Sequence, residues 1–258
     1  MKSVVLASQK GGVGKTTVAL NLGYALARIG LRTLVVDTDP QGGIGLSVQA
    51  PGTTCGLAGV LSGQRSAKSA VVNTRLREFG LLPVGQVSPL ETQEFFERLA
   101  DGRALGRLLE DLSALYDVAL VDTPAGFGGA TTGALRVADA VVSPVQAEPL
   151  AVRSLTQLLE VLHVLRQQGG HCRLAGLVIT MAQLRDGASL GAMEELWRVF
   201  PADVLFSSTV ARDPAFLAAS AAGVPLGLLS RHAPPAAAVF DQLARELDAR
   251  LGLVASED

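Results

Sequence analysis

The residues best suited to chemistry lie near the start of the chain, in Lys10–Thr17, which reads KGGVGKTT. Glycines let backbone N–H groups converge on an anion, and a helix starting here would add the positive end of its dipole. In such a phosphate loop we expect Lys15 on the β- and γ-phosphates, Thr16 on Mg²⁺ and Thr17 on the α-phosphate. The backbone donors would come from Gly11, Gly12, Val13 and Gly14. The segment therefore predicts a site for ATP and Mg²⁺.

Lys10 is a second lysine in the same loop, directly before its first glycine. From there it cannot easily reach the γ-phosphate from the same side as Lys15, but it could reach a phosphate presented by a second subunit. The alternative is a solvated lysine at the end of a strand. We interpret Lys10 and Lys15 as catalytic residues of two different kinds.

Acidic residues follow two further strand-like runs. Asp37 ends the run Thr33–Asp37 and Asp39 follows it, and Asp122 ends the hydrophobic run Val118–Asp122. Ligands of open α/β sheets bind outside the carboxyl ends of the strands, so these acids should face the phosphate loop. One carboxylate of the pair Asp37 and Asp39 would hold a water on Mg²⁺ and the other would orient the attacking water, while Asp122 would hold Mg²⁺ through water. Taken singly, each acid could equally cap a helix.

Short β-branched runs alternate with longer amphipathic stretches, which is typical of a doubly wound, mostly parallel sheet with helices on both faces. The expected strands are Val4–Ala7, Thr33–Asp37, Leu81–Val84, Val118–Asp122, Ala140–Val145, Leu174–Met181 and Val204–Phe206. The expected helices are Thr16–Ile29, Ala104–Leu115, Val152–Gln168, Leu190–Val199 and Pro235–Leu251. We predict a single α/β domain over residues 1–258, with Gln41–Lys68 as irregular surface.

Composition limits the class of protein. The 258 residues carry a net charge of −2 and are 48% hydrophobic, which indicates a globular chain without a general attraction to nucleic acid. Cys55 and Cys172 form no CxxC pair, which argues against a thiolate metal site. No apolar run approaches the roughly 20 residues that span a bilayer, so we expect a cytoplasmic protein. Trp197, at helical spacing from Met193, is expected in the core.

Together these motifs resemble the ParA/MinD family of deviant-Walker P-loop ATPases, and within it the short, Soj-like ParA type without an N-terminal extension. The resemblance runs from Lys2 to about Leu251. It rests on KGGVGKTT (10–17), DTDPQG (37–42), VDTP (121–124), ADAVVSPVQAE (138–148) and TMAQLRD (180–186). It implies Mg²⁺-dependent ATP hydrolysis in a homodimer that forms when ATP binds.

The resemblance also implies roles for single residues. Lys10 would reach across the dimer, Asp39 would orient the hydrolytic water, and Glu148 would lie near the ribose across the interface. Thr16, Asp37 and Asp122 would form the Mg²⁺ shell. The adenine would lie beside residues that follow later strands at the same edge of the sheet, namely Thr180, Met181, Val210, Ala211 and Arg212.

The implied partners are non-specific nucleoid DNA and a ParB-like or other adaptor that stimulates hydrolysis and release. Arg185 and Arg212 match family positions near the DNA-facing surface, although the sequence departs from the family pattern at Ala211 and in Ala218–Ala221. A MinD-like ATPase acting at a membrane or on a protein partner is the alternative. Ala236–Asp258 carries two positive and five negative charges, which argues against a membrane-binding helix. The cargo could be a chromosome, a plasmid or a protein assembly.

Overall fold

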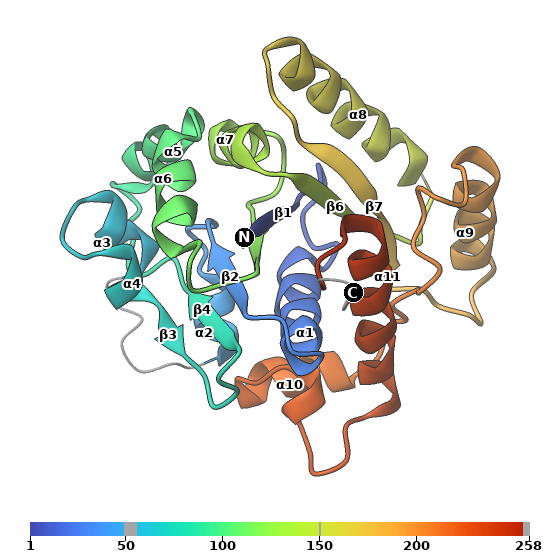
Figure 1. Ribbon diagram of the computed structural model, residues 1–258. Coiled ribbons are helices and arrows are strands. Elements are labelled where there is room, and N and C mark those ends of the chain that lie inside the picture. Colours follow the sequence, from blue (N-terminus) through green and yellow to red (C-terminus); the bar gives the residue numbers. More distant parts are fainter. Residues whose placement is uncertain (49–55, 150, 255–258) are drawn as a thin grey trace.

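The computed structural model describes residues 1–48, 56–149 and 151–254. Seven strands form one sheet in the order β3-β4-β2-β5-β1-β6-β7 (Figure 1). All neighbours are parallel except β3, which pairs antiparallel with β4. The strands are β1 Lys2–Leu6, β2 Thr33–Asp37, β3 Val72–Asn73, β4 Phe79–Leu82, β5 Val118–Asp122, β6 Ala140–Gln146 and β7 Arg173–Thr180. The predicted mostly parallel sheet is therefore confirmed.

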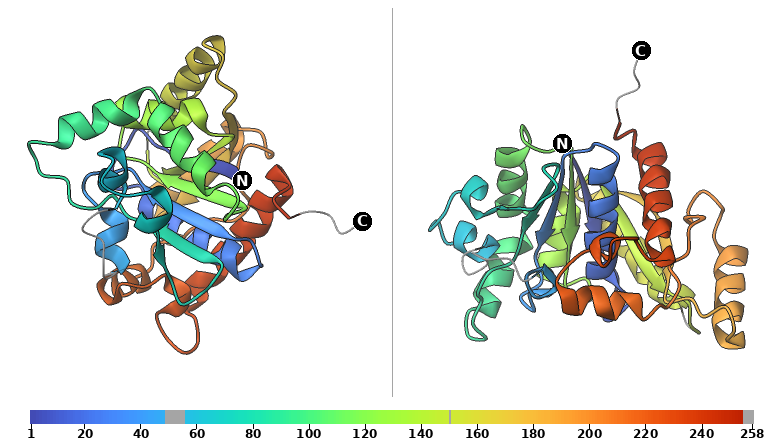
Figure 2. Two further views of the ribbon diagram at one scale, coloured as in Figure 1. Left: turned by 60° about the vertical axis from the view of Figure 1, so that its left-hand side comes forward. Right: turned by 90° about the horizontal axis from the view of Figure 1, so that it is seen from below.

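Helices cover both faces of the sheet, and Figure 2 shows the sheet between the two layers. One face carries α1 Lys15–Arg28 and α11 Ala238–Leu251. The other face carries α5 Thr92–Ala100, α6 Arg103–Leu112, α7 Gly129–Val137 and α8 Ala151–Gln167. Beyond β7, α9 Gly187–Val199 packs against α8. The shorter helices are α2 Gly43–Val48, α3 Leu57–Leu61, α4 Ala67–Ala70, α10 Ala215–Ala222, η2 Leu226–Leu228 and η3 Pro235–Ala237.

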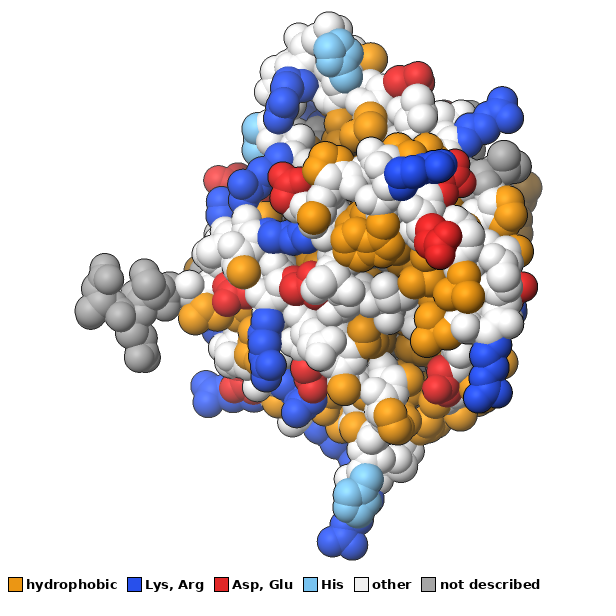
Figure 3. Space-filling view, turned by 90° about the vertical axis from the view of Figure 1, so that its right-hand side faces the viewer, with side chains coloured by type: hydrophobic (Ala, Val, Ile, Leu, Met, Phe, Trp, Pro, Cys, Tyr) orange, Lys and Arg blue, Asp and Glu red, His pale blue; other side chains and the backbone are white. Residues whose placement is uncertain are grey.

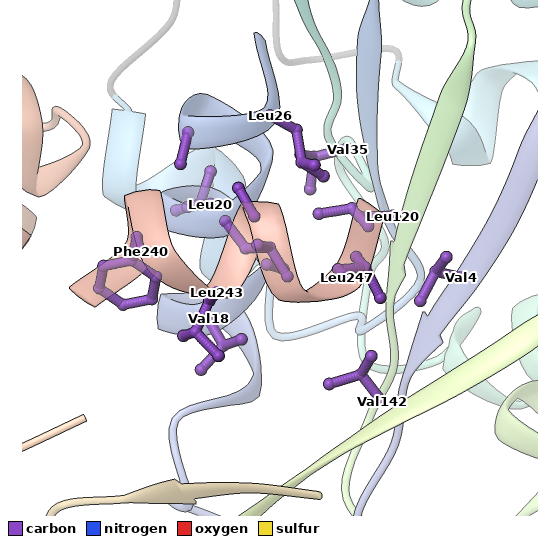
Figure 4. Close-up of a cluster of buried hydrophobic side chains, with 14 of the residues drawn as sticks. Val4, Val18, Leu20, Leu26, Val35, Leu120, Val142, Phe240, Leu243 and Leu247 are labelled. Carbon is purple, nitrogen blue, oxygen red and sulfur yellow. The ribbon is translucent and has the colours of Figure 1, made fainter. Parts of the chain in front are cut away.

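Alternate strand residues supply the two cores, because successive side chains of a strand point to opposite faces. In β1, Val4 faces α1 and α11, whereas Val5 faces the helices of the other layer. Figure 4 shows the first cluster, in which Leu243 of α11 meets Val18 of α1. A β-carbon on Gly23 would lie 2.6 Å from the side chain of Val35 in β2. Glycine there lets α1 lie close against the sheet, which fixes the helix that follows the phosphate loop.

Three expectations about the fold are wrong. Val204–Phe206 forms no regular strand and makes only an isolated bridge, between Leu177 and Leu205. Gln41–Lys68 is not simply irregular surface, because α2 and α3 lie within it and bury Ile44 completely. Cys55 and its neighbours in 49–55 lie outside the described residues. Trp197 is 40% exposed, because α9 turns it away from the buried side of the helix.

Candidate functional site

The phosphate loop joins β1 to α1 and leaves the start of α1 open. Gly14 precedes the helix with a φ of 91°, and no side chain caps the helix or places an acid in its first turn. Gly12 is also left-handed, with a φ of 75°, and a β-carbon on either glycine would meet nothing within 4 Å. Because no side chain of the described residues caps the start of α1, its first backbone N–H groups are open, and the loop is shaped to receive an anion.

Two buried side chains tie the loop and the first turn of α1 to the rest of the molecule. Thr180, at the end of β7, donates from Oγ1 to the carbonyl of Val13 over 2.9 Å. Asn21 donates to the carbonyl of Thr17 over 2.8 Å and accepts from the N–H of Leu226 over 2.7 Å. These bonds hold the loop in place before any ligand arrives.

Lys15 is 8% exposed and lies among the carboxylates of the strand ends. Burial lowers the pKa of Lys15, and the negative charges of Asp122 and Asp39 partly oppose that change. A buried ammonium ion loses hydration that only nearby negative charge can replace. The position of Lys15 therefore favours an anionic ligand at the mouth of the loop.

The acids at the ends of β2 and β5 are completely buried. Thr16 donates from Oγ1 to Asp122 Oδ2 over 2.6 Å, while Asp37 accepts from the N–H groups of Asp39 (3.0 Å) and Ile44 (3.1 Å). In the described residues, Asp122 Oδ1 is the one buried side-chain oxygen or nitrogen without a hydrogen-bond partner. Burial, then the charge of Asp37, raises the pKa of Asp122 to about 8. Burial also raises the pKa of Asp37, to about 7.

This arrangement fits a divalent cation. Water on a cation would donate to the free Asp122 oxygen, and the charge of the cation would lower the cost of two adjacent buried carboxylates. Across the described residues, no group of three His, Cys, Asp or Glu gathers closely enough to hold a metal alone. Mg²⁺, which keeps several waters and uses hydroxyl and phosphate oxygens, suits Thr16 beside these two acids.

Asp39 lies just outside the buried pair and is half-buried. Its Oδ1 accepts from the N–H of Gln41 over 3.0 Å, and its carbonyl accepts from the N–H of Gly42 over 2.8 Å. Its negative charge acts on both Lys15 and Asp122. Among the described residues, only Oδ1 of Asp39 accepts a hydrogen bond, so its Oδ2 can face the mouth of the site.

Lys10 and Glu148 form an ion pair on the outer side of the loop. Their side chains are 49% and 32% exposed. They border a cleft of about 320 Å³ that Arg153 and Gln157 of α8 also line. The resemblance implies that Lys10 and Glu148 act across a dimer interface, and the single chain pairs them with each other.

A second cleft, of about 400 Å³, opens beside the first turn of α1. Its lining includes all five residues predicted to contact adenine: Thr180, Met181, Val210, Ala211 and Arg212. The loop and α1 contribute Val13, Gly14, Thr17 and Val18. Sequence reasoning missed Asp213, Pro214, Phe216 and Leu217. An Asp-Pro pair before an apolar run is a helix-start signal, and it could have placed the start of α10 at this cleft.

The two arginines proposed for DNA lie in different settings. Arg185 is exposed in the turn between β7 and α9 and does not line the second cleft. Arg212 is exposed but lines that cleft. Figure 3 shows basic groups separated by acidic and hydrophobic ones on the face that carries α9 and α11. This face therefore presents scattered basic side chains rather than a continuous basic stripe.

Comparison with known proteins agrees with the site. A family model described as an AAA domain matches residues 1–173. The chain is 30% identical to the sporulation initiation inhibitor protein Soj of Bacillus subtilis, over 96% of this chain and 98% of that protein. It is 35% identical to the chromosome-partitioning ATPase Soj of Thermus thermophilus, over 97% of each chain.

Solved structures extend the comparison to the whole fold. The septum site-determining protein MinD of Pyrococcus horikoshii, solved in complex with Mg-ADP, superposes with a TM-score of 0.78. It is 26% identical to this chain, and the match covers 99% of both chains. The chain has the phosphate loop and the buried acids, and it matches Soj relatives over nearly their whole length. It therefore belongs to the ParA/MinD family of P-loop ATPases.

Proposed function

We propose that this ATPase acts as a single domain in a partitioning or positioning cycle. ATP and Mg²⁺ bind at the phosphate loop, two subunits associate, and the dimer holds DNA without sequence preference. An adaptor protein stimulates hydrolysis and the dimer separates. The cycle would segregate a chromosome, as the name of the Thermus thermophilus relative suggests, or a plasmid or protein assembly, and would operate on the nucleoid in the cytoplasm.

The observation that carries this proposal is the buried, unpartnered oxygen of Asp122 beside Thr16 and Lys15. Thr16 would bind Mg²⁺ directly, and Asp122 and Asp37 would hold it through water. Lys15 would neutralise the β- and γ-phosphates, and Asp39 would orient water for attack. Mg²⁺ supplies charge neutralisation on the phosphates. Phosphoryl transfer depends mainly on such positioning and charge, and these residues supply both.

Dimer formation is supported by the exposure of Lys10 at the rim of the loop. An exposed ion pair contributes about 0–1 kcal/mol, so Lys10 can leave Glu148 at little cost when a second nucleotide approaches. Glu148 and Arg153 lie beside the same cleft and would meet the partner subunit there. The rim is therefore suited to a contact that forms only when ATP is present.

DNA binding rests on Arg185, with Arg212 as a second candidate. Two copies of a weak phosphate contact in one dimer bind more tightly than either alone, so a modest basic surface suffices. The MinD-like alternative would need an apolar surface for a bilayer. The apolar side of α11 is buried against α1, and none of the described helices is long and apolar enough to cross a membrane.

The test is DNA co-sedimentation at one stated salt concentration, with Mg-ATP and with Mg-ADP. Asp39→Ala should hold ATP without rapid hydrolysis, so it should remain on DNA with ATP and dissociate with ADP. Arg185→Glu in the same background should weaken DNA binding about tenfold or more while ATP affinity stays unchanged. Arg166→Glu, an exposed charge reversal on α8, is the matched control.

Equal binding to DNA with ATP and ADP, or none with either, would contradict the DNA part of the proposal. Liposome flotation with the same nucleotides then tests the membrane alternative. Normal phosphate release by Asp39→Ala would remove the proposed role of Asp39. These three readouts separate hydrolysis, DNA binding and membrane binding.

A further inference from the structure

The chain between α9 and α10 runs along β7, the last strand of the sheet, with an irregular register. The carbonyls of Leu177 and Ile179, two residues apart, accept from the N–H groups of Phe206 and Val210, each over 2.9 Å. In a regular parallel ladder those donors would also be two residues apart, but here they are four apart. The residues Ser207–Thr209 therefore bulge away from β7, and their N–H groups lose the strand as an acceptor.

Glu246, in the middle of α11, accepts the hydrogen bonds that the bulge would otherwise lose. Its Oε2 accepts from the N–H of Ser207 over 2.7 Å, and its Oε1 accepts from the N–H of Ser208 over 3.0 Å. The hydroxyl of Ser208 donates to the same Oε1 over 2.5 Å. Burial raises the pKa of Glu246, but the hydrogen bonds from Ser208 and Ser207 outweigh it and leave the pKa lowered. The three bonds thus favour the carboxylate form.

Directly after the bulge the chain becomes one wall of the second cleft. Val210, Ala211 and Arg212 line the cleft, and Ala182 fixes their position with two backbone hydrogen bonds of 3.0 and 3.2 Å. The lining also includes Met181, the one non-glycine residue of the described chain with a positive φ, at 53°. Irregular backbone of this kind clusters at ligand sites and persists only where surrounding contacts hold it.

We propose that Glu246 is a positioning residue for the nucleoside half of the ligand, which rests on the proposed binding of ATP in this cleft. Its carboxylate sets the bulge, and the bulge sets how close Val210–Arg212 stand to the base. The phosphate end is held separately, through Thr180 to Val13 and through Thr16 to Asp122. Loss of Glu246 should therefore weaken recognition of the nucleoside and leave recognition of the phosphates unchanged.

The experiment is calorimetric titration of the full chain with Mg-ATP and, separately, with Mg-tripolyphosphate, which has no nucleoside. Glu246→Ala should bind Mg-ATP about tenfold more weakly than the natural chain, a change of ~1.4 kcal/mol. Its affinity for Mg-tripolyphosphate should change by less than about twofold. A change of that size is within the scatter of ordinary surface substitutions. Glu246→Gln, which keeps one acceptor oxygen, should show the same selectivity with a smaller loss, and serves if the alanine variant does not fold.

Asp248→Ala is the matched control, because Asp248 lies on the same helix and also accepts from two backbone N–H groups. Those groups belong to Leu253 and Val254, after the helix, at 2.8 and 2.7 Å. Its two affinities should match those of the natural chain. Equal losses for both ligands in the Glu246 variants, or no loss, would overturn the inference. Failure of the natural chain to bind Mg-ATP would instead overturn the proposed function.

Discussion

The inner and outer sides of the phosphate loop differ in how their polar groups are held. On the inner side, Lys15, Asp37 and Asp122 are buried, and hydrogen bonds within the chain fix the two acids. On the outer side, Lys10 and Glu148 are partly exposed and pair with each other through their side chains. The inner side is built by folding, whereas the outer side can exchange its partner at little cost.

This difference assigns the two lysines of one loop to different tasks. A buried charged group that leaves its partner has neither water nor a counter-charge to stabilise it. Lys15 therefore suits a fixed role on its own nucleotide. An exposed lysine can move between a carboxylate of its own chain and a phosphate of another. A substitution on one side of the loop should therefore change the function of that side and leave the other side unchanged.

The largest effect should come from Lys15→Ala. Removing one preorganised charge from the phosphates should lower ATP turnover about 100- to 1,000-fold, measured as steady-state phosphate release. The fold should remain stable, since burial opposes the charged form of Lys15 and lowers its pKa. Lys68→Ala, an exposed lysine on α4, is the control and should keep normal turnover. Turnover close to normal in Lys15→Ala would contradict the inner role.

Much of the inner side could be predicted from sequence, since its pattern is local. The order of strand, glycines, Lys15, Thr16 and helix specifies the loop, and an acid at a strand end specifies Asp37 and Asp122. The structure brings all of these together. The roles of Asn21 and Glu246 could not be predicted. Asn21 binds backbone 205 residues away in the sequence and Glu246 binds backbone 38 residues away, and no local pattern marks such contacts.

The fold was predictable where hydrophobic runs were long and regular. The ranges expected for β2 and β5 match the structure, and α1, α8 and α11 begin or end within a few residues of their predicted bounds. Val204–Phe206 looked like a strand from its composition, yet it pairs with β7 only around Leu177, and Arg250 of α11 donates to the carbonyl of Leu205. Helices α5 and α7 were not among the expected helices: Gly129 and Gly133 weaken the helical pattern of α7, and α5 has only nine residues.

A smaller effect is expected in the pH dependence of the metal-free protein. Both Asp37 and Asp122 have folded-state pKa values raised by burial, to about 7 and about 8. The folded chain therefore keeps protons that the unfolded chain releases above about pH 4, so stability should fall as pH rises from about 4 to 8. Asp122→Asn should reduce this fall, raising Tm at pH 8 by about 5 °C, or ~2 kcal/mol.

Asp117→Asn is the control for this measurement, followed by thermal unfolding with a chelator present. Asp117 lies at the opposite end of β5, and its hydrogen bonds with Arg32 lower its pKa. Its variant should keep the full decline in Tm between pH 4 and 8. A natural chain whose Tm rises over this range would show that the two buried acids do not control the stability of the inner side.

The smallest effect on the fold, and the most selective, should come from Lys10→Ala on the outer side. Without ATP the variant should unfold within about 2 °C of the natural chain, since an exposed ion pair contributes so little. With Mg²⁺ and a slowly hydrolysed ATP analogue, the dimer dissociation constant should rise at least about tenfold, since a charge would be lost from a phosphate contact between subunits. Sedimentation equilibrium measures that constant directly.

Lys2→Ala separates this role from a general effect of surface charge. Lys2 also forms an ion pair, with Asp139 at 3.5 Å, and its side chain is 52% exposed against 49% for Lys10. The two substitutions remove the same charge from nearly equal exposure, and only Lys10 stands beside the phosphate loop. Equal dimerisation of both variants would mean that the outer side needs no lysine from the loop, and the second lysine would then be only a solvated residue at the end of β1.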